Sequence, residues 1–62
     1  MSSREVIQRL REDGWYEVAH EGSHKQFKHG TKKGRVTVPH PVQDIPIGTL
    51  RSIEKQANIR LR

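Results

Sequence analysis

The sequence contains no cysteine, no long apolar run and no leader-like N-terminus. Without cysteine, neither a disulfide framework nor a thiolate metal site can form, which fits a reducing compartment. No apolar stretch approaches the roughly 20 residues that cross a bilayer. The first five residues lack the apolar core of a signal peptide. By elimination, we expect a soluble cytoplasmic protein that does not associate with membranes.

The chain is also short and has little negative charge. Its 62 residues leave room for one domain, which we expect to span residues 1–62. A chain of this size buries only about 60% of the surface that its unfolded form exposes, so we expect its free energy of unfolding to be small. Twelve Lys and Arg oppose seven Asp and Glu, giving a net charge of +5. This charge favours contact with nucleic acid, although many small proteins are basic without binding any.

The N-terminal segment has the pattern of an amphipathic helix. Ser2 and Glu5 have the spacing of a capping box. Apolar residues then recur at helical spacing, and Gly14 suits a left-handed C-terminal cap. We therefore expect a helix of about three turns that ends before Gly14.

A second helix is predicted near the C-terminus. Pro46 fits its first turn, where a missing N–H is no loss. The apolar stripe that would face the core consists of Ile47, Leu50, Ile53 and Ala57. Asn58 can adopt the left-handed cap. We expect residues 60–62 to form a frayed tail.

Three strands are predicted between the helices: Trp15–Glu21, His24–His29 and Arg35–Val38. Aromatic and β-branched residues open the first, and polar–apolar alternation marks the third. Gly22 and Ser23 read as a hairpin turn between the first two. Trp15 and Tyr16 are expected in the core rather than stacked on bases. The pair Lys32–Lys33 is most simply a solvated hairpin tip, with phosphate contact as the alternative.

These elements predict an α+β fold of order α-β-β-β-α, with a three-stranded antiparallel sheet and two helices on one face. Phe27, Val36 and Val38 should point at the helices. Strand alternation then sends a polar set to the opposite face. That set comprises His24, Gln26, Lys28, Arg35 and Thr37.

His24 is the candidate for chemistry because it lies at the junction of the turn and the second strand. An imidazole exchanges protons near neutral pH, and removing the proton of a ribose 2′-hydroxyl starts RNA cleavage. Gly22 and Ser23 would let the RNA backbone approach, and the nearest cations for phosphate contact are Lys25, Lys28 and Arg35. From the residue pattern alone, a lone surface histidine is more often an ordinary polar strand residue than a catalytic one.

Two other kinds of site are excluded on residue pattern. Ser23 is no nucleophile beside His24, because adjacent strand residues point to opposite faces and no third group orients them. The four histidines show no compelling metal-ligand spacing, and too few other ligands accompany them. We therefore expect neither a metal nor another cofactor.

Taken together, several segments of the chain resemble the HicA family, small toxins of bacterial and archaeal toxin–antitoxin pairs. The segments are Asp13-Gly14-Trp15, Gly22-Ser23-His24, Val36-Thr37-Val38-Pro39-His40-Pro41, Ile47-Gly48-Thr49-Leu50-Arg51-Ser52-Ile53 and Lys55-Gln56-Ala57. They cover nearly the whole chain in the order and spacing of the family. Gly-Ser-His is not specific by itself; its combination with the downstream helix motif is.

The resemblance implies a double-stranded-RNA-binding-domain-like fold and a ribosome-independent endoribonuclease that cleaves mRNA without metal and arrests translation. Carried over by position, His24 is the catalytic residue and Gly22 matters for toxicity. The implied partners are mRNA and a HicB-like antitoxin, with DNA contacted only through the antitoxin.

The sequence departs from the family pattern at two positions. Lys25 stands where many members have a second histidine, so the general acid could be Lys25, another group or water. Asn58 stands where many have glycine, a change that affects the cap rather than the chemistry. Two other functions stay open: a non-catalytic RNA-binding module of the same fold, and an interaction domain that needs a partner for stability.

Overall fold

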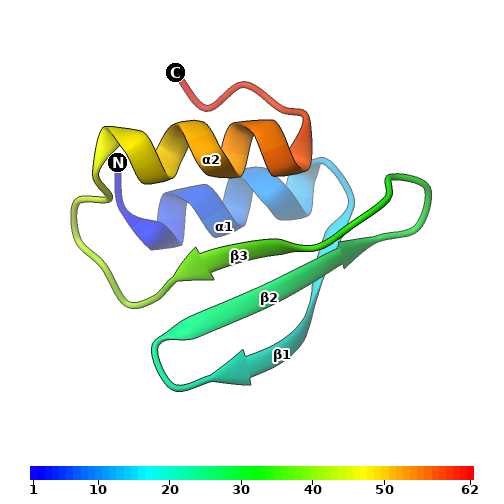
Figure 1. The fold of residues 1–62 in the computed structure, drawn as a ribbon, viewed down its shortest axis with the longest axis horizontal. Coiled ribbons are helices and arrows are strands. Elements are labelled where there is room, and N and C mark those ends of the chain that lie inside the picture. Colours follow the sequence, from blue (N-terminus) through cyan, green and yellow to red (C-terminus); the bar gives the residue numbers. More distant parts are fainter.

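The computed structural model describes residues 1–62. Figure 1 shows the order α1, β1, β2, β3, α2, with both helices on one side of the sheet. The elements are α1 (Ser3–Glu12), β1 (Trp15–Glu21), β2 (His24–His29), β3 (Val36–Pro39) and α2 (Ile47–Ala57). The strands are antiparallel in the order β1-β2-β3. The predicted α+β fold is confirmed, and the third strand lies one residue later than expected.

Helix α1 begins and ends as its sequence predicts. The Ser2 hydroxyl accepts from the Glu5 N–H at 3.1 Å, and the Glu5 carboxylate accepts from the Ser2 N–H at 2.9 Å. These bonds complete the capping box, and the backbone bond from Ser2 lowers the pKa of Glu5. Gly14 follows the helix with φ of +104°, and a Cβ there would lie 2.7 Å from Nε2 of His29. Glycine is therefore required for both conformation and space.

Strand β1 is irregular. Its register with β2 shifts between Glu17 and Ala19, which leaves Val18 in a bulge, 41% exposed. Trp15 is buried, but Tyr16 is 52% exposed. The expectation that both aromatic residues enter the core is wrong for Tyr16, because successive strand side chains point to opposite faces and Trp15 occupies the inner one.

One hydrophobic core lies between the sheet and the helices. Its members are Val6, Ile7, Leu10, Trp15, Phe27, Val36, Val38, Ile45, Leu50, Ile53, Ala57 and Leu61. The predicted inward positions of Phe27 and both strand valines are confirmed. Ile47 is 56% exposed, so its expected place in the stripe is wrong. Ile45, in the connector before α2, fills the core instead, at 3% exposure.

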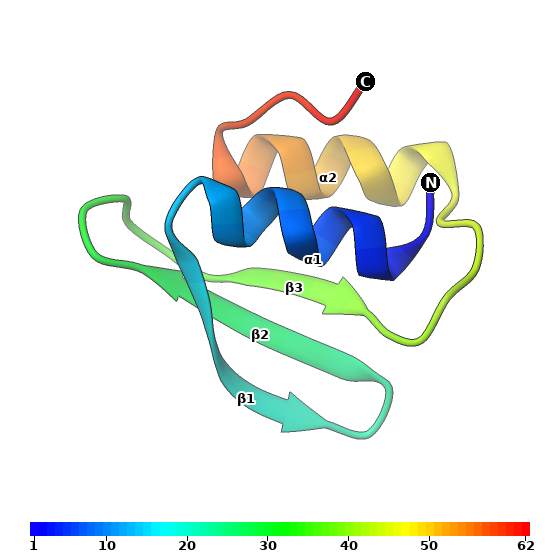
Figure 2. The ribbon, with the colours of Figure 1, turned by 180° about the vertical axis from the view of Figure 1, so that it is seen from behind.

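The C-terminal tail is docked rather than frayed, which corrects the sequence prediction. Figure 2 shows it running back along α2. Leu61 is buried, and its N–H donates to the Glu54 carboxylate at 2.7 Å. This backbone hydrogen bond is the main reason that the pKa of Glu54 is lowered. The turn that makes this possible is Asn58, whose φ of 53° and ψ of 49° confirm the left-handed cap.

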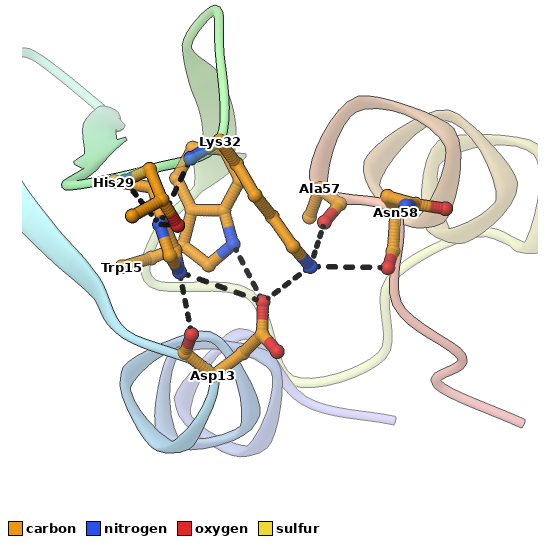
Figure 3. Close-up of polar contacts among 7 residues, drawn as sticks. Asp13, Trp15, His29, Lys32, Ala57 and Asn58 are labelled. Atoms are coloured by element: carbon orange, nitrogen blue, oxygen red, sulfur yellow. Dashed lines mark hydrogen bonds and ion pairs between the residues drawn. The ribbon is translucent and has the colours of Figure 1, made fainter.

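The loop that was expected to be solvated contributes to a polar cluster at the C-terminal ends of both helices (Figure 3). Lys32 donates to Asp13 Oδ2 at 2.6 Å and to the carbonyls of Ala57 and Asn58 at 3.0 and 3.2 Å. The Trp15 indole also donates to Asp13 Oδ2, at 3.2 Å. Lys32 is therefore an anchoring residue, because its stem is long enough to reach both helix ends.

The two edges of the sheet differ. The edge of β3 is covered by α2, where the Thr37 N–H donates to Oε1 of Gln56 at 3.2 Å. The outer edge of β1 has no partner strand. Because Gln56 of α2 binds the edge of β3, the polar side of α2 borders the open face of the sheet. Neither helix has the length and apolarity needed to cross a membrane.

Candidate functional site

His24 is held at a corner of the sheet by backbone geometry. It pairs with Glu21 of β1 and with Pro39 of β3, and only two residues join the hairpin. Gly22 has φ of +58°, a conformation that side-chain-bearing residues rarely adopt. The carbonyl of Ser23 accepts from the His40 N–H at 2.7 Å, which ties the turn to the end of β3. These backbone contacts fix the position of the His24 Cα and therefore the point from which its side chain projects.

The His24 side chain is exposed and lines a shallow hollow of about 420 Å³. The hollow lies where the open face of the sheet meets α2. Its other lining residues are Thr37, Pro39, Gly48, Thr49, Ser52 and Gln56. All of them are uncharged. The hollow therefore offers a proton-exchanging ring surrounded by hydroxyl and amide groups and open to a large substrate.

The other three histidines are in different environments. His29 donates from Nε2 to the Asp13 carbonyl at 2.6 Å and accepts at Nδ1 from the Thr31 N–H at 3.0 Å. Nδ1 of His40 is hydrogen-bonded to the buried Ser3 hydroxyl at 2.8 Å, and burial is the main reason that the pKa of His40 is lowered. His20 pairs with Lys25 on the helix-side face. His24 alone lies in the hollow.

The predicted cationic contacts divide between the two faces. Lys25 alternates with His24 and lies on the helix side, where its ammonium binds Glu17 at 3.0 Å. That hydrogen bond is the main reason that the pKa of Glu17 is lowered. Lys28 and Arg35 share the open face with His24, and Arg35 donates to Gln26 at 2.9 Å. The structure therefore brings two of the three cations to the side of the imidazole.

Gly22 and Ser23 lie in the exposed turn next to His24 but outside the lining of the hollow. A Cβ at Gly22 would meet no neighbouring atom, so the position favours glycine because of its positive φ and not because of limited space. No group of three or more potential ligand side chains is placed to hold a metal ion.

Sequence reasoning missed the side chains of α2 that complete the hollow. Gly48, Thr49, Ser52 and Gln56 recur three and four residues apart, the spacing of one helix face. That periodicity was a usable signal, but nothing in it places this face beside His24. The hydrogen bond between Gln56 and the edge of β3 does so.

Comparisons with known proteins agree with this arrangement. The family model described as HicA toxin of bacterial toxin-antitoxin matches residues 3–59. A solved structure, titled HicA3 and HicB3 toxin-antitoxin complex, superposes with a TM-score of 0.84 and 35% identity over 100% of each chain. Comparison with curated proteins gave no match.

The fold and the match over nearly the whole chain define a toxin of a toxin–antitoxin pair. The chain belongs to the HicA toxin family. The resemblance noted in the sequence is thereby confirmed.

Proposed function

We propose that this chain is a metal-independent endoribonuclease that cleaves mRNA and so arrests translation in the cytoplasm. The observation that carries the proposal is the position of His24, an exposed imidazole in a polar hollow where the open face of the sheet meets α2. Membership of a toxin family supports a damaging activity of this kind. The net charge of +5 supports a polyanionic substrate.

The proposed reaction is an internal transesterification of RNA. His24 accepts the proton of a ribose 2′-hydroxyl, whose oxygen attacks the adjacent phosphorus. A P–O2′ bond forms and the P–O5′ bond breaks, leaving a 2′,3′-cyclic phosphate. The 5′-oxygen takes a proton from the imidazolium or from water. Deoxyribose has no 2′-hydroxyl, so this mechanism selects RNA over DNA.

The proposed RNA path follows the open face of the sheet. Lys28 and Arg35 lie on this face and are positioned to contact phosphates that flank the cleaved linkage. Gly22 and Ser23 lie beside His24 in the exposed turn, where a polynucleotide backbone can approach. Lys25 lies on the other face and is paired with Glu17, so the path that we propose does not include it.

The direct test replaces His24 with alanine. We expect His24→Ala to lower RNA cleavage by about 10²–10⁴-fold, the usual contribution of a general acid–base residue. Its melting temperature should be unchanged because the side chain is exposed. Cleavage is followed with radiolabelled mRNA in EDTA.

His20→Ala is the matched control, because it removes an exposed imidazole from the helix-side face. It should retain the wild-type rate. A folded His24→Ala protein that cleaves as fast as wild type contradicts the role of His24. A gel shift of intact RNA by the wild-type chain, without new fragments, favours the non-catalytic RNA-binding module.

We further propose a HicB-like antitoxin as the protein partner, since the structural relative was solved as a HicA3–HicB3 complex. An antitoxin that covers the open face would block the hollow of His24. Addition of the cognate antitoxin should therefore inhibit cleavage and raise the melting temperature of the toxin. DNA would be contacted only through the antitoxin.

A further inference from the structure

The α2 motif Ile47–Ile53 has a polar half that the core does not use. Leu50 and Ile53 are buried, whereas Thr49 and Ser52 line the hollow of His24. Gln56, one turn further along, lines it as well. The hydrophobic positions thus explain how the helix packs, and the polar positions require another explanation.

Gln56 is oriented by the sheet. Its Oε1 accepts the Thr37 N–H at 3.2 Å, so its amide nitrogen is left to donate elsewhere. The hydroxyls of Thr49 and Ser52 are uncharged donors on the same face of α2. The hollow therefore combines one amide donor with two hydroxyl donors around the imidazole.

We propose that Thr49, Ser52 and Gln56 form the binding site for the phosphate of the linkage that is cleaved, stabilising its non-bridging oxygens through uncharged hydrogen-bond donors. The proposal rests on the proposed function and names the groups that bind the reacting phosphate. Charge accumulates on these oxygens as the 2′-oxygen attacks, and donors positioned in advance stabilise it.

The cations of the open face do not line the hollow of His24. Lys28 is four residues from His24 along β2, which corresponds to about 13 Å at roughly 3.3 Å per residue. Arg35 binds Gln26, which is two residues from His24. Lys28 and Arg35 are instead placed to contact the phosphates next to the one that reacts. None of the residues that line the hollow is Lys or Arg, so its neutral donors are the groups placed to contact the reacting phosphate.

The test separates donor loss from fold and from net charge. Gln56→Glu keeps the oxygen that accepts from Thr37 but replaces the amide donor with an anionic oxygen. Ser52→Ala removes one hydroxyl, and Ser52→Thr restores it. Gln8→Glu makes the same charge change at an exposed position of α1. Steady-state cleavage of a fluorogenic RNA oligonucleotide and thermal melting are measured for each variant.

We expect Gln56→Glu to lower kcat by about 10²-fold, in line with removal of an oxyanion donor, and Ser52→Ala by about 10-fold. Ser52→Thr should recover most of the rate, and Gln8→Glu should match wild type. All melting temperatures should stay close to that of wild type.

Several outcomes would overturn the proposal. One is wild-type rates in both Gln56→Glu and Ser52→Ala, and another is an equal loss in Gln8→Glu. Loss of rate that tracks loss of melting temperature would show a purely structural role. In each case wild type still cleaves and His24→Ala does not, so the proposed function stands. A wild-type chain that leaves RNA intact overturns both.

Discussion

Lys32 shows how much one side chain contributes to this small protein. It donates to a carboxylate at the end of α1 and to two carbonyls at the end of α2 (Figure 3). Those carbonyls have no partner within the helix, so a cation there also interacts favourably with the helix dipole. A loop lysine thereby joins two elements that are distant in sequence.

The first prediction concerns Lys32→Met. Its hydrogen bond is the main reason that the pKa of Asp13 is lowered. We expect the variant to lose about 1–2 kcal/mol at neutral pH, between the value for exposed ion pairs and that for hydrogen bonds to charged groups, because the pair is half-buried. A lowered carboxyl pKa contributes stability above the ordinary aspartate value of about 3.9, and this is lost as pH falls through the folded pKa. The difference from wild type should therefore shrink at acidic pH.

Thermal melts of both proteins from pH 7 to pH 2 measure this difference. Lys33→Met is the matched control, since Lys33 is exposed and should change stability by less than about 0.5 kcal/mol. A Lys32→Met protein as stable as wild type at neutral pH would show that the cluster contributes nothing.

At the scale of the element, α2 has three surfaces with different tasks. Its apolar side packs in the core, its edge-facing Gln56 covers β3, and its polar residues border His24. The left-handed turn at Asn58 then returns the chain so that Leu61 is buried. The helix end therefore determines where the tail docks.

The second prediction concerns this turn. Asn58→Ala should destabilise the protein by about 1 kcal/mol, because a left-handed conformation costs most side-chain-bearing residues about 1–2 kcal/mol and asparagine tolerates it better. Asn58→Gly should be at least as stable as wild type. For a chain of this size, the loss corresponds to a melting temperature about 4–8 °C lower. Circular dichroism melts compare the variants; equal melting of all three would contradict the expectation.

At the scale of the whole molecule, positive charge is present on both sides of the sheet but is not equally free. Lys25 is paired with Glu17 on the helix side. Lys28 and Arg35 are exposed on the open face, where Arg35 donates a hydrogen bond to the neutral Gln26. The two cations that share the face of His24 therefore have no acidic partner to compete with phosphate.

The third prediction is a salt dependence measured on the His24→Ala background, where binding is not complicated by cleavage. Each phosphate contact contributes about 0.7 to the slope of log K against log salt for a single strand. Lys28→Ala with Arg35→Ala should therefore lower the slope by about 1.4. Lys25→Ala with Arg11→Ala removes the same charge from the helix side and should change it less. Equal changes would place the RNA elsewhere.

Much of the architecture was predictable from local patterns. The capping box of Ser2 and Glu5, the glycine after α1 and the alternation around Phe27 depend on neighbours within a few residues. Three of the wrong predictions share one cause. For Tyr16, Ile47 and the C-terminal tail, burial depends on which part of the core surface is left uncovered by other segments. Neither an apolar side chain nor a position at the chain end reveals this.

The sequence by itself determined the order of the elements and the face of β2 from which His24 projects, because strand alternation and helix periodicity are local properties of the backbone. Only the tertiary structure decided what surrounds that imidazole. Docking of α2 along the edge of β3 places Ser52 and Gln56 beside it. Such docking depends on contacts between segments far apart in the chain, which no local spacing encodes.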